Sequence, residues 1–111
     1  MTRLPHIAEI STGTGPSFAL FVKRYLQYNE EGYTYEMFKS YNSVLMDNML
    51  LPCSRNYAYR TIYILKALNL IDKSRSSKSE RLQFRRIYYT LVDLNEEDPK
   101  WLNHEKYYSR N

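Results

Sequence analysis

Cysteine and histidine are scarce in this chain of 111 residues, which contains one cysteine, Cys53, and two histidines. A single cysteine excludes an internal disulfide, and Cys53 with His6 and His104 offers no zinc-ligand spacing. No nucleophile, base and acid occur together at a recognisable spacing. The sequence therefore predicts neither a metal centre nor a cofactor, and we expect a binding protein rather than an enzyme.

Long hydrophobic runs are also absent. The longest apolar stretches, 18–22 and 49–51, are far shorter than the roughly 20 residues that span a membrane. The first residues lack the charged flank, apolar run and cleavage site of a secretory signal. Gly13 and Gly15 suggest a phosphate-binding loop, but the Lys and Ser or Thr that must follow are missing. We therefore expect a cytoplasmic protein without membrane contact. At Gly13 and Gly15 we expect an ordinary loop.

The composition is that of one folded domain. Hydrophobic residues make up 43% of the chain and charged residues 25%, which is enough apolar surface to close a core. We expect an N-terminal arm at 1–15, a domain at 16–92 and a C-terminal helix at 93–111. The expected fold class is α+β.

Basic charge is concentrated in one segment. The chain carries a net charge of +4, and the segment 73–86 holds six basic residues and one acid. An acidic patch of Asp93, Glu96, Glu97 and Asp98 follows directly. This polarity is expected of a molecule that presents one face to phosphate and keeps another away from it.

Apolar spacing and capping residues predict three helices and a hairpin. Pro16 and Ser17 begin the first helix, Thr34 caps the second, and Ser54 caps a third that runs from Arg55 to about Asn69. A strand at 70–75, a polar turn at 76–79 and a strand at 81–92, with a bulge near Arg85 and Arg86, form the hairpin. Asp98 and Pro99 begin a last helix.

The third helix has two distinct faces. Ala58, Thr61, Ile62, Leu65 and Leu68 share one side. The opposite side combines cations with aromatic hydrogen-bonding groups, and these are Arg55, Asn56, Tyr59, Arg60, Tyr63 and Lys66. Charged helix faces are most often only solvated, but here a basic hairpin follows directly, which favours contact with nucleic acid.

The order of three helices and a hairpin resembles the winged-helix superfamily of DNA-binding proteins, most clearly at 54–92. Residues 64–73 resemble the end of a recognition helix that leads into the first wing strand, with Asn69 in place of the usual glycine at the turn. The compact size resembles winged-helix regulators of archaea and their viruses. The turn has Ser76 and Ser77 instead of glycine, and we expect no ligand-binding domain after it.

The resemblance implies that the third helix enters the major groove of double-stranded DNA and that the wing reaches the backbone. By position, it assigns base and phosphate contacts on the helix to Arg55, Asn56, Tyr59, Arg60 and Tyr63. It assigns wing contacts to Arg75, Lys78 and Arg81. The implied function is sequence-specific duplex binding in transcription regulation, with no small-molecule effector evident.

Three alternatives stay open. The tyrosine-rich helix suits docking to another protein, and exposed tyrosines suit stacking on RNA or single-stranded DNA. Arg85 and Arg86 at the root of the wing could pair with the acidic patch.

We expect a homodimer held in part by Trp101, Leu102 and Tyr108, because two copies read a palindrome. The other arrangement is that these side chains fold back onto their own subunit.

Overall fold

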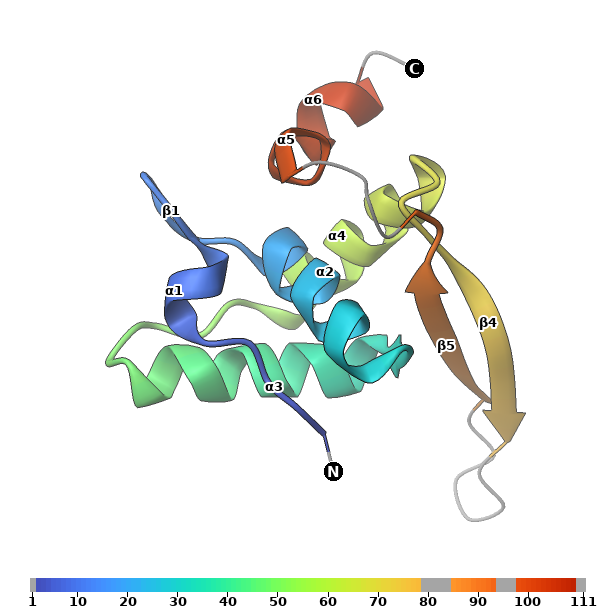
Figure 1. The fold of residues 1–111 in the computed structure, drawn as a ribbon, viewed down its shortest axis with the longest axis horizontal. Coiled ribbons are helices and arrows are strands. Elements are labelled where there is room, and N and C mark those ends of the chain that lie inside the picture. The colour runs from blue at the N-terminus through green and yellow to red at the C-terminus, as the bar shows by residue number, and fades with distance from the viewer. Residues whose placement is uncertain (1, 79–84, 94–97, 110–111) are drawn as a thin grey trace.

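A computed structural model describes residues 2–78, 85–93 and 98–109 of the chain (Figure 1). It is an α+β fold with one two-stranded and one three-stranded antiparallel sheet. The helices are α1 (Ile7–Ile10), α2 (Phe18–Asn29), α3 (Thr34–Asp47), α4 (Arg55–Ala67), α5 (Asp98–Leu102) and α6 (His104–Ser109). The strands are β1 (Ser11–Thr12), β2 (Gly15–Pro16), β3 (Gly32–Tyr33), β4 (Ile71–Lys78) and β5 (Arg85–Leu91).

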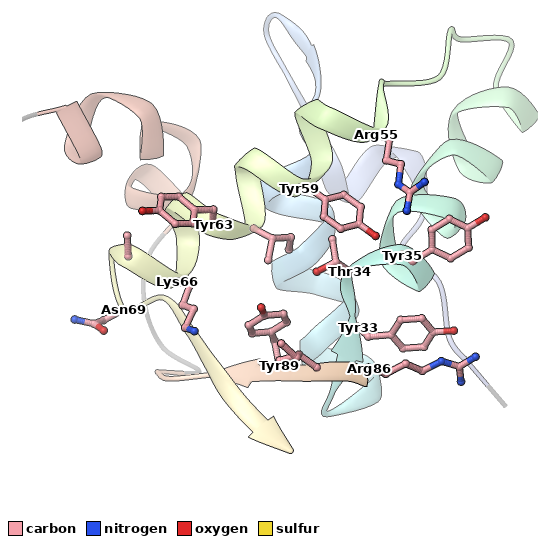
Figure 2. Close-up of a pocket in the computed structure, with 13 residues that line it drawn as sticks. Tyr33, Thr34, Tyr35, Arg55, Tyr59, Tyr63, Lys66, Asn69, Arg86 and Tyr89 are labelled. Carbon is pink, nitrogen blue, oxygen red and sulfur yellow. The ribbon is translucent and has the colours of Figure 1, made fainter. Parts of the chain in front are cut away.

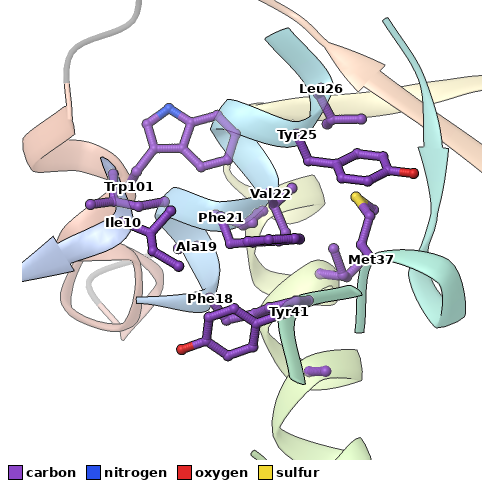
Figure 3. Close-up of a cluster of buried hydrophobic side chains, with 14 of the residues drawn as sticks. Ile10, Phe18, Ala19, Phe21, Val22, Tyr25, Leu26, Met37, Tyr41 and Trp101 are labelled. Atoms are coloured by element: carbon purple, nitrogen blue, oxygen red, sulfur yellow. The ribbon is translucent and has the colours of Figure 1, made fainter. Parts of the chain in front are cut away.

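Helices α2, α3 and α4 enclose the core, as their apolar spacing predicts. The side-chain oxygens of Ser17 and Ser54 accept hydrogen bonds from the first turns of α2 and α4, which confirms the expected start of α2 and the expected Ser54 cap. Helix α3 begins at Thr34, but Tyr33 is its N-cap and provides no side-chain hydrogen bond. Aromatic rings fill the centre (Figure 3), where the Tyr41 ring lies 5.1 Å from that of Phe18, centroid to centroid.

The expected hairpin is present and is joined by a third strand. The sheet order is β3-β5-β4, because the two residues of β3 pair with Tyr88 and Tyr89 of β5. The expected turn at 76–79 is wrong, since Ser76 and Ser77 pair with Ile87 and Arg86 and β4 continues to Lys78. The irregularity in the register lies between Lys73 and Arg75, not at the expected bulge on the opposite strand. Serine is common in turns, which is why the sequence predicts a turn at Ser76 and Ser77. Backbone pairing with β5 keeps both residues in the strand instead.

The segment before α2 is more ordered than the expected arm and loop. His6 caps α1 in a capping box with Glu9, and Ile10 is completely buried. The Arg3 guanidinium lies 4.1 Å from the centroid of the Tyr28 ring, whose hydroxyl donates to Glu9. This segment is therefore fixed to the outer side of α2 by local and aromatic contacts.

The expected single C-terminal helix is divided into α5 and α6 at Asn103. Trp101 is completely buried, and Figure 3 shows its indole beside Ile10 and Val22. The Asp98 carboxylate accepts hydrogen bonds from Lys23 Nζ at 2.6 Å and from Arg24 Nη2 at 3.2 Å. α5 is thus fixed to α2 by a buried ring and two ion pairs.

Gly32 has less space for a side chain than the other two glycines. A Cβ at this position would lie 2.7 Å from Cε1 of Tyr25 and 3.3 Å from Cγ of Met37. We expect Gly32→Ala to lower the free energy of unfolding by about 1–3 kcal/mol, because the Tyr25 ring is buried and its hydroxyl is bonded to Glu36. Gly13→Ala is the control, since nothing lies within 4 Å of its Cβ. Denaturant unfolding measures both, and equal stabilities of the two variants would show that the ring moves freely.

The Asp98 ion pairs give a pH dependence of stability. Hydrogen bonding to Lys23 and the nearby Arg24 hold the pKa of Asp98 below its ordinary value of 3.8. A lowered folded-state pKa stabilises the fold above the ordinary value, and this contribution is lost as the pH falls through the folded-state pKa. We expect the stability difference between the wild type and Asp98→Asn to be constant at neutral pH and to shrink between about pH 4 and pH 2. Unfolding titrations measure it, and a difference that stays constant down to pH 2 would contradict the assignment.

Candidate nucleic-acid interface

A groove of about 1150 Å³ runs between α4, the start of α3 and β5 (Figure 2). We call it the tyrosine groove, because five of its lining residues are tyrosines: Tyr33, Tyr35, Tyr59, Tyr63 and Tyr89. Its other lining residues include three cations, Arg55, Lys66 and Arg86, and no described acid. The surface is therefore aromatic, cationic and rich in hydroxyl groups.

Helix periodicity brings six residues of α4 to this groove, and four of them have long polar or aromatic side chains. Arg55, Tyr59, Tyr63 and Lys66 lie one turn apart along one face, which Figure 2 shows directed over the groove. The exposed fraction of Tyr59 is 41% and that of Tyr63 is 63%. The opposite face of α4 is in the core, so the helix presents a solvent-facing row of two tyrosines between two basic side chains.

Arg55 lies among aromatic rings at the first turn of α4. Its guanidinium carbon is 5.7 Å from the centroid of the Tyr35 ring and 5.4 Å from that of Tyr59. Both distances fall within the range in which a cation is attracted to a ring face. Contacts with rings on α3 and α4 thus restrict the directions available to a long side chain at the mouth of the groove.

Arg86 forms the other basic wall, on β5. Its guanidinium carbon lies 4.8 Å from the centroid of the Tyr33 ring, and that ring meets Tyr88 edge to face at 5.4 Å. Tyr89, which also lines the groove, is partly buried, and burial raises the pKa of its hydroxyl. The hydroxyl remains protonated at neutral pH and can donate a hydrogen bond to an anion.

The three groove cations have no acidic partner in the parts of the chain that the structure describes. The ion pairs of those parts join Lys23 and Arg24 to Asp98, Arg60 to Glu105 and Arg75 to Glu31. Arg55, Lys66 and Arg86 take part in none of them. Their charge is therefore available to an anionic ligand.

The structure brings together only some of the residues predicted on α4. Arg55, Tyr59 and Tyr63 line the groove, but Asn56 and Arg60 do not. Asn56 is exposed to solvent. The Arg60 guanidinium is bonded to the Glu105 carboxylate of α6, with Nε to Oε1 at 3.3 Å and Nη2 to Oε2 at 3.2 Å. The predicted face was drawn too wide, because residues one position along a helix are turned by about 100°.

The predicted wing residues also separate. Arg75 is bonded to Glu31, with Nη2 to Oε1 at 2.6 Å, and lies over the Tyr88 ring at 3.8 Å. A carboxylate 44 residues earlier in the chain therefore pairs with Arg75, and the contact of Arg75 with DNA stays a prediction. Lys78 is the last residue of β4, and its backbone lies opposite that of Arg85 in the β4-β5 ladder. The Lys78 side chain and all of Arg81 lie outside the described residues.

Lys66 and Arg86 are groove residues that the assignment by position omitted. Lys66 lies two turns after Tyr59 on the same helix face, so the helix period alone is sufficient to include it. Arg86 needs the register of the sheet, which places it beside Ser77 and close to β3. The open alternative paired Arg86 with the acidic patch, and no described acid does so. Glu96 and Glu97 lie outside the described residues.

The three residues predicted at a dimer interface have different surroundings. Trp101 is completely buried in its own subunit, so its ring is not available to a second copy. Tyr108 is partly buried, and its ring meets Tyr63 edge to face at 6.1 Å. Leu102 is 41% exposed. Trp101 and Tyr108 therefore pack within their own subunit. Of the three residues, only Leu102 is well exposed for a dimer contact.

Other kinds of site have little support in the described parts of the chain. No three His, Cys, Asp or Glu side chains lie close enough there to hold a metal ion. Burial raises the pKa of the Cys53 thiol, which makes it a poor nucleophile at neutral pH. None of the described helices has the length and apolarity needed to cross a membrane.

No protein-family model, curated protein or solved structure matches this chain. A function for the tyrosine groove must therefore be inferred from its geometry and its charge.

Proposed function

We propose that the chain is a winged-helix protein that binds double-stranded DNA through the tyrosine groove. The order α2-β3-α3-α4-β4-β5 and the sheet order β3-β5-β4 support the winged-helix assignment. In this assignment α4 is the recognition helix and the β4-β5 hairpin is the wing. The observation that carries the proposal is the set of three cations, Arg55, Lys66 and Arg86, that line the groove without a described acidic partner.

The dimensions of α4 suit the major groove of DNA. The helix has 13 residues and is exposed along the side that carries Arg55, Tyr59 and Tyr63. A major groove about 12 Å wide admits one α-helix, and its base edges are read by arginine and by hydrogen-bonding side chains. With α4 in the major groove, β5 approaches the adjacent backbone, where Arg86 and the tyrosine hydroxyls contact phosphate.

Sequence-specific binding and transcription regulation belong to the same proposal. A single α4 reads few base pairs, so we infer that two copies bind a palindrome with half-sites roughly 34–36 Å apart. Trp101 does not form this dimer because it is buried in its own subunit. Sedimentation of the free protein and of its duplex complex measures the number of copies.

The first prediction about DNA binding separates phosphate contacts from the general effect of charge. Lys66→Ala and Arg86→Ala each remove one groove cation, so each should flatten the log-log dependence of affinity on salt by about 0.9. Lys100→Ala removes the same charge from α5, outside the groove lining, and should change the slope by much less. Anisotropy titrations of a labelled duplex at several salt concentrations measure these slopes.

Three results would contradict duplex binding through the groove. One is an equal effect of all three substitutions, and another is a wild-type affinity that does not depend on salt, as expected for a protein-docking module. The third is tighter binding to single-stranded DNA or RNA of the same length, which would assign the exposed tyrosines to base stacking.

The second prediction concerns Arg55, which the rings of Tyr35 and Tyr59 orient at the start of α4. An arginine in the major groove pairs with two acceptors of guanine and is worth roughly 1–3 kcal/mol of discrimination. We expect the wild type to select a guanine at one position from random duplexes, and Arg55→Ala to lose that preference. Lys66→Ala, which removes a phosphate contact, should keep it. The same selected sequence for wild type and Arg55→Ala would limit Arg55 to phosphate contact.

A further inference from the structure

Helix α6 makes two side-chain contacts with the outward-facing side of α4. Glu105 is bonded through both carboxylate oxygens to Arg60, and the Tyr108 ring meets the Tyr63 ring at 6.1 Å. Arg60 and Tyr63 are three residues apart on α4, and Glu105 and Tyr108 are three residues apart on α6. One turn of α6 therefore lies along one turn of α4. Tyr63 is also a lining residue of the tyrosine groove. An element from the end of the chain thus lies at the edge of the surface that we assign to DNA.

The two C-terminal helices are held with very different strength. α5 is fixed by the buried Trp101 and by the pairing of Asp98 with Lys23 and Arg24. His104, at the start of α6, is also buried. Beyond it, α6 contacts α4 through the partly buried Tyr108 ring and through an exposed ion pair, in which Arg60 is 58% exposed and Glu105 is 53% exposed. Exposed ion pairs contribute little to stability, so the end of α6 can separate from α4 while α5 stays in place.

We propose that α6 competes with the DNA backbone for α4, with the Glu105 carboxylate occupying the position on Arg60 that a phosphate takes in the complex. The proposal depends on the proposed function and adds to it a means of regulation. A guanidinium bonds a carboxylate and a phosphate with the same two-pronged geometry, which makes the exchange chemically direct. While Glu105 is in place it also repels an approaching phosphate. Displacement of α6 frees Arg60 and exposes more of the Tyr63 ring.

The test is a pair of charge-matched substitutions. Glu105→Gln and Glu30→Gln each remove one exposed acid, but Glu30 lies at the end of α2, and no described side chain is bonded to its carboxylate. We expect Glu105→Gln to bind a duplex about fivefold or more tightly than Glu30→Gln, at the lower end of typical coupling between sites. A general reduction of negative charge would raise both affinities equally. Far-UV circular dichroism checks that both variants fold.

A second pair of variants assigns the effect to Arg60. In an Arg60→Ala background Glu105 has no guanidinium to occupy, so Glu105→Gln should improve the affinity no more than Glu30→Gln does. A persistent fivefold advantage in that background would contradict competition for Arg60. Equal affinities of Glu105→Gln and Glu30→Gln in the wild-type background would also overturn the proposal.

The outcomes separate this proposal from the proposed function. If the wild type binds duplex DNA in a salt-dependent way and Glu105→Gln behaves like Glu30→Gln, duplex binding stands and competition by α6 is overturned. If neither the wild type nor Glu105→Gln binds duplex DNA at low salt, both proposals fail. If only Glu105→Gln binds measurably, the competition is strong and both proposals are supported.

Discussion

The packing of one face of α4 into the core is the constraint on which the rest of the structure depends. Ala58 and Leu65 are completely buried, and Thr61 is 1% exposed. Because a helix is rigid, fixing these positions also fixes the direction of Arg55, Tyr59, Tyr63 and Lys66 on the opposite side. Asn69, at a φ of 60°, then turns the chain into β4. The position of the hairpin beside α4, and with it the tyrosine groove, follows from this buried face.

Local patterns predicted the parts of the site that belong to single elements. The helix at α4, its Ser54 cap, the left-handed Asn69 and the hairpin all follow from apolar spacing and residue conformation, and the structure confirms them. Three of the five predicted α4 residues line the groove for the same reason. The α+β class is also confirmed, whereas the winged-helix assignment and DNA binding remain proposals that the element order supports.

The sequence could not predict which cations are neutralised. Arg60 pairs with Glu105, 45 residues later, and Arg75 pairs with Glu31, 44 residues earlier. Such pairs depend on the packing of α6 and on the register of β4, and neither has a local signature. β3 has only two residues, which is too short for a strand pattern, yet it places Tyr33 beneath Arg86. The burial of Trp101 in its own subunit also has no local signature, because the surface of α2 that covers the ring exists only in the folded chain. The sequence therefore offered Trp101 equally to a dimer interface.

The positive charge of the molecule is distributed unevenly between ion pairs and the tyrosine groove. A net charge of +4 spread evenly would attract DNA weakly and without orientation. The pairs formed by Lys23, Arg24, Arg60 and Arg75 remove those cations from the long-range field. Arg55, Lys66 and Arg86 are in none of these pairs, and they lie together around one concave surface where low-dielectric walls concentrate the potential. A phosphate that displaced Glu105 would free the Arg60 cation on the exposed surface of α4, next to the groove residue Tyr59.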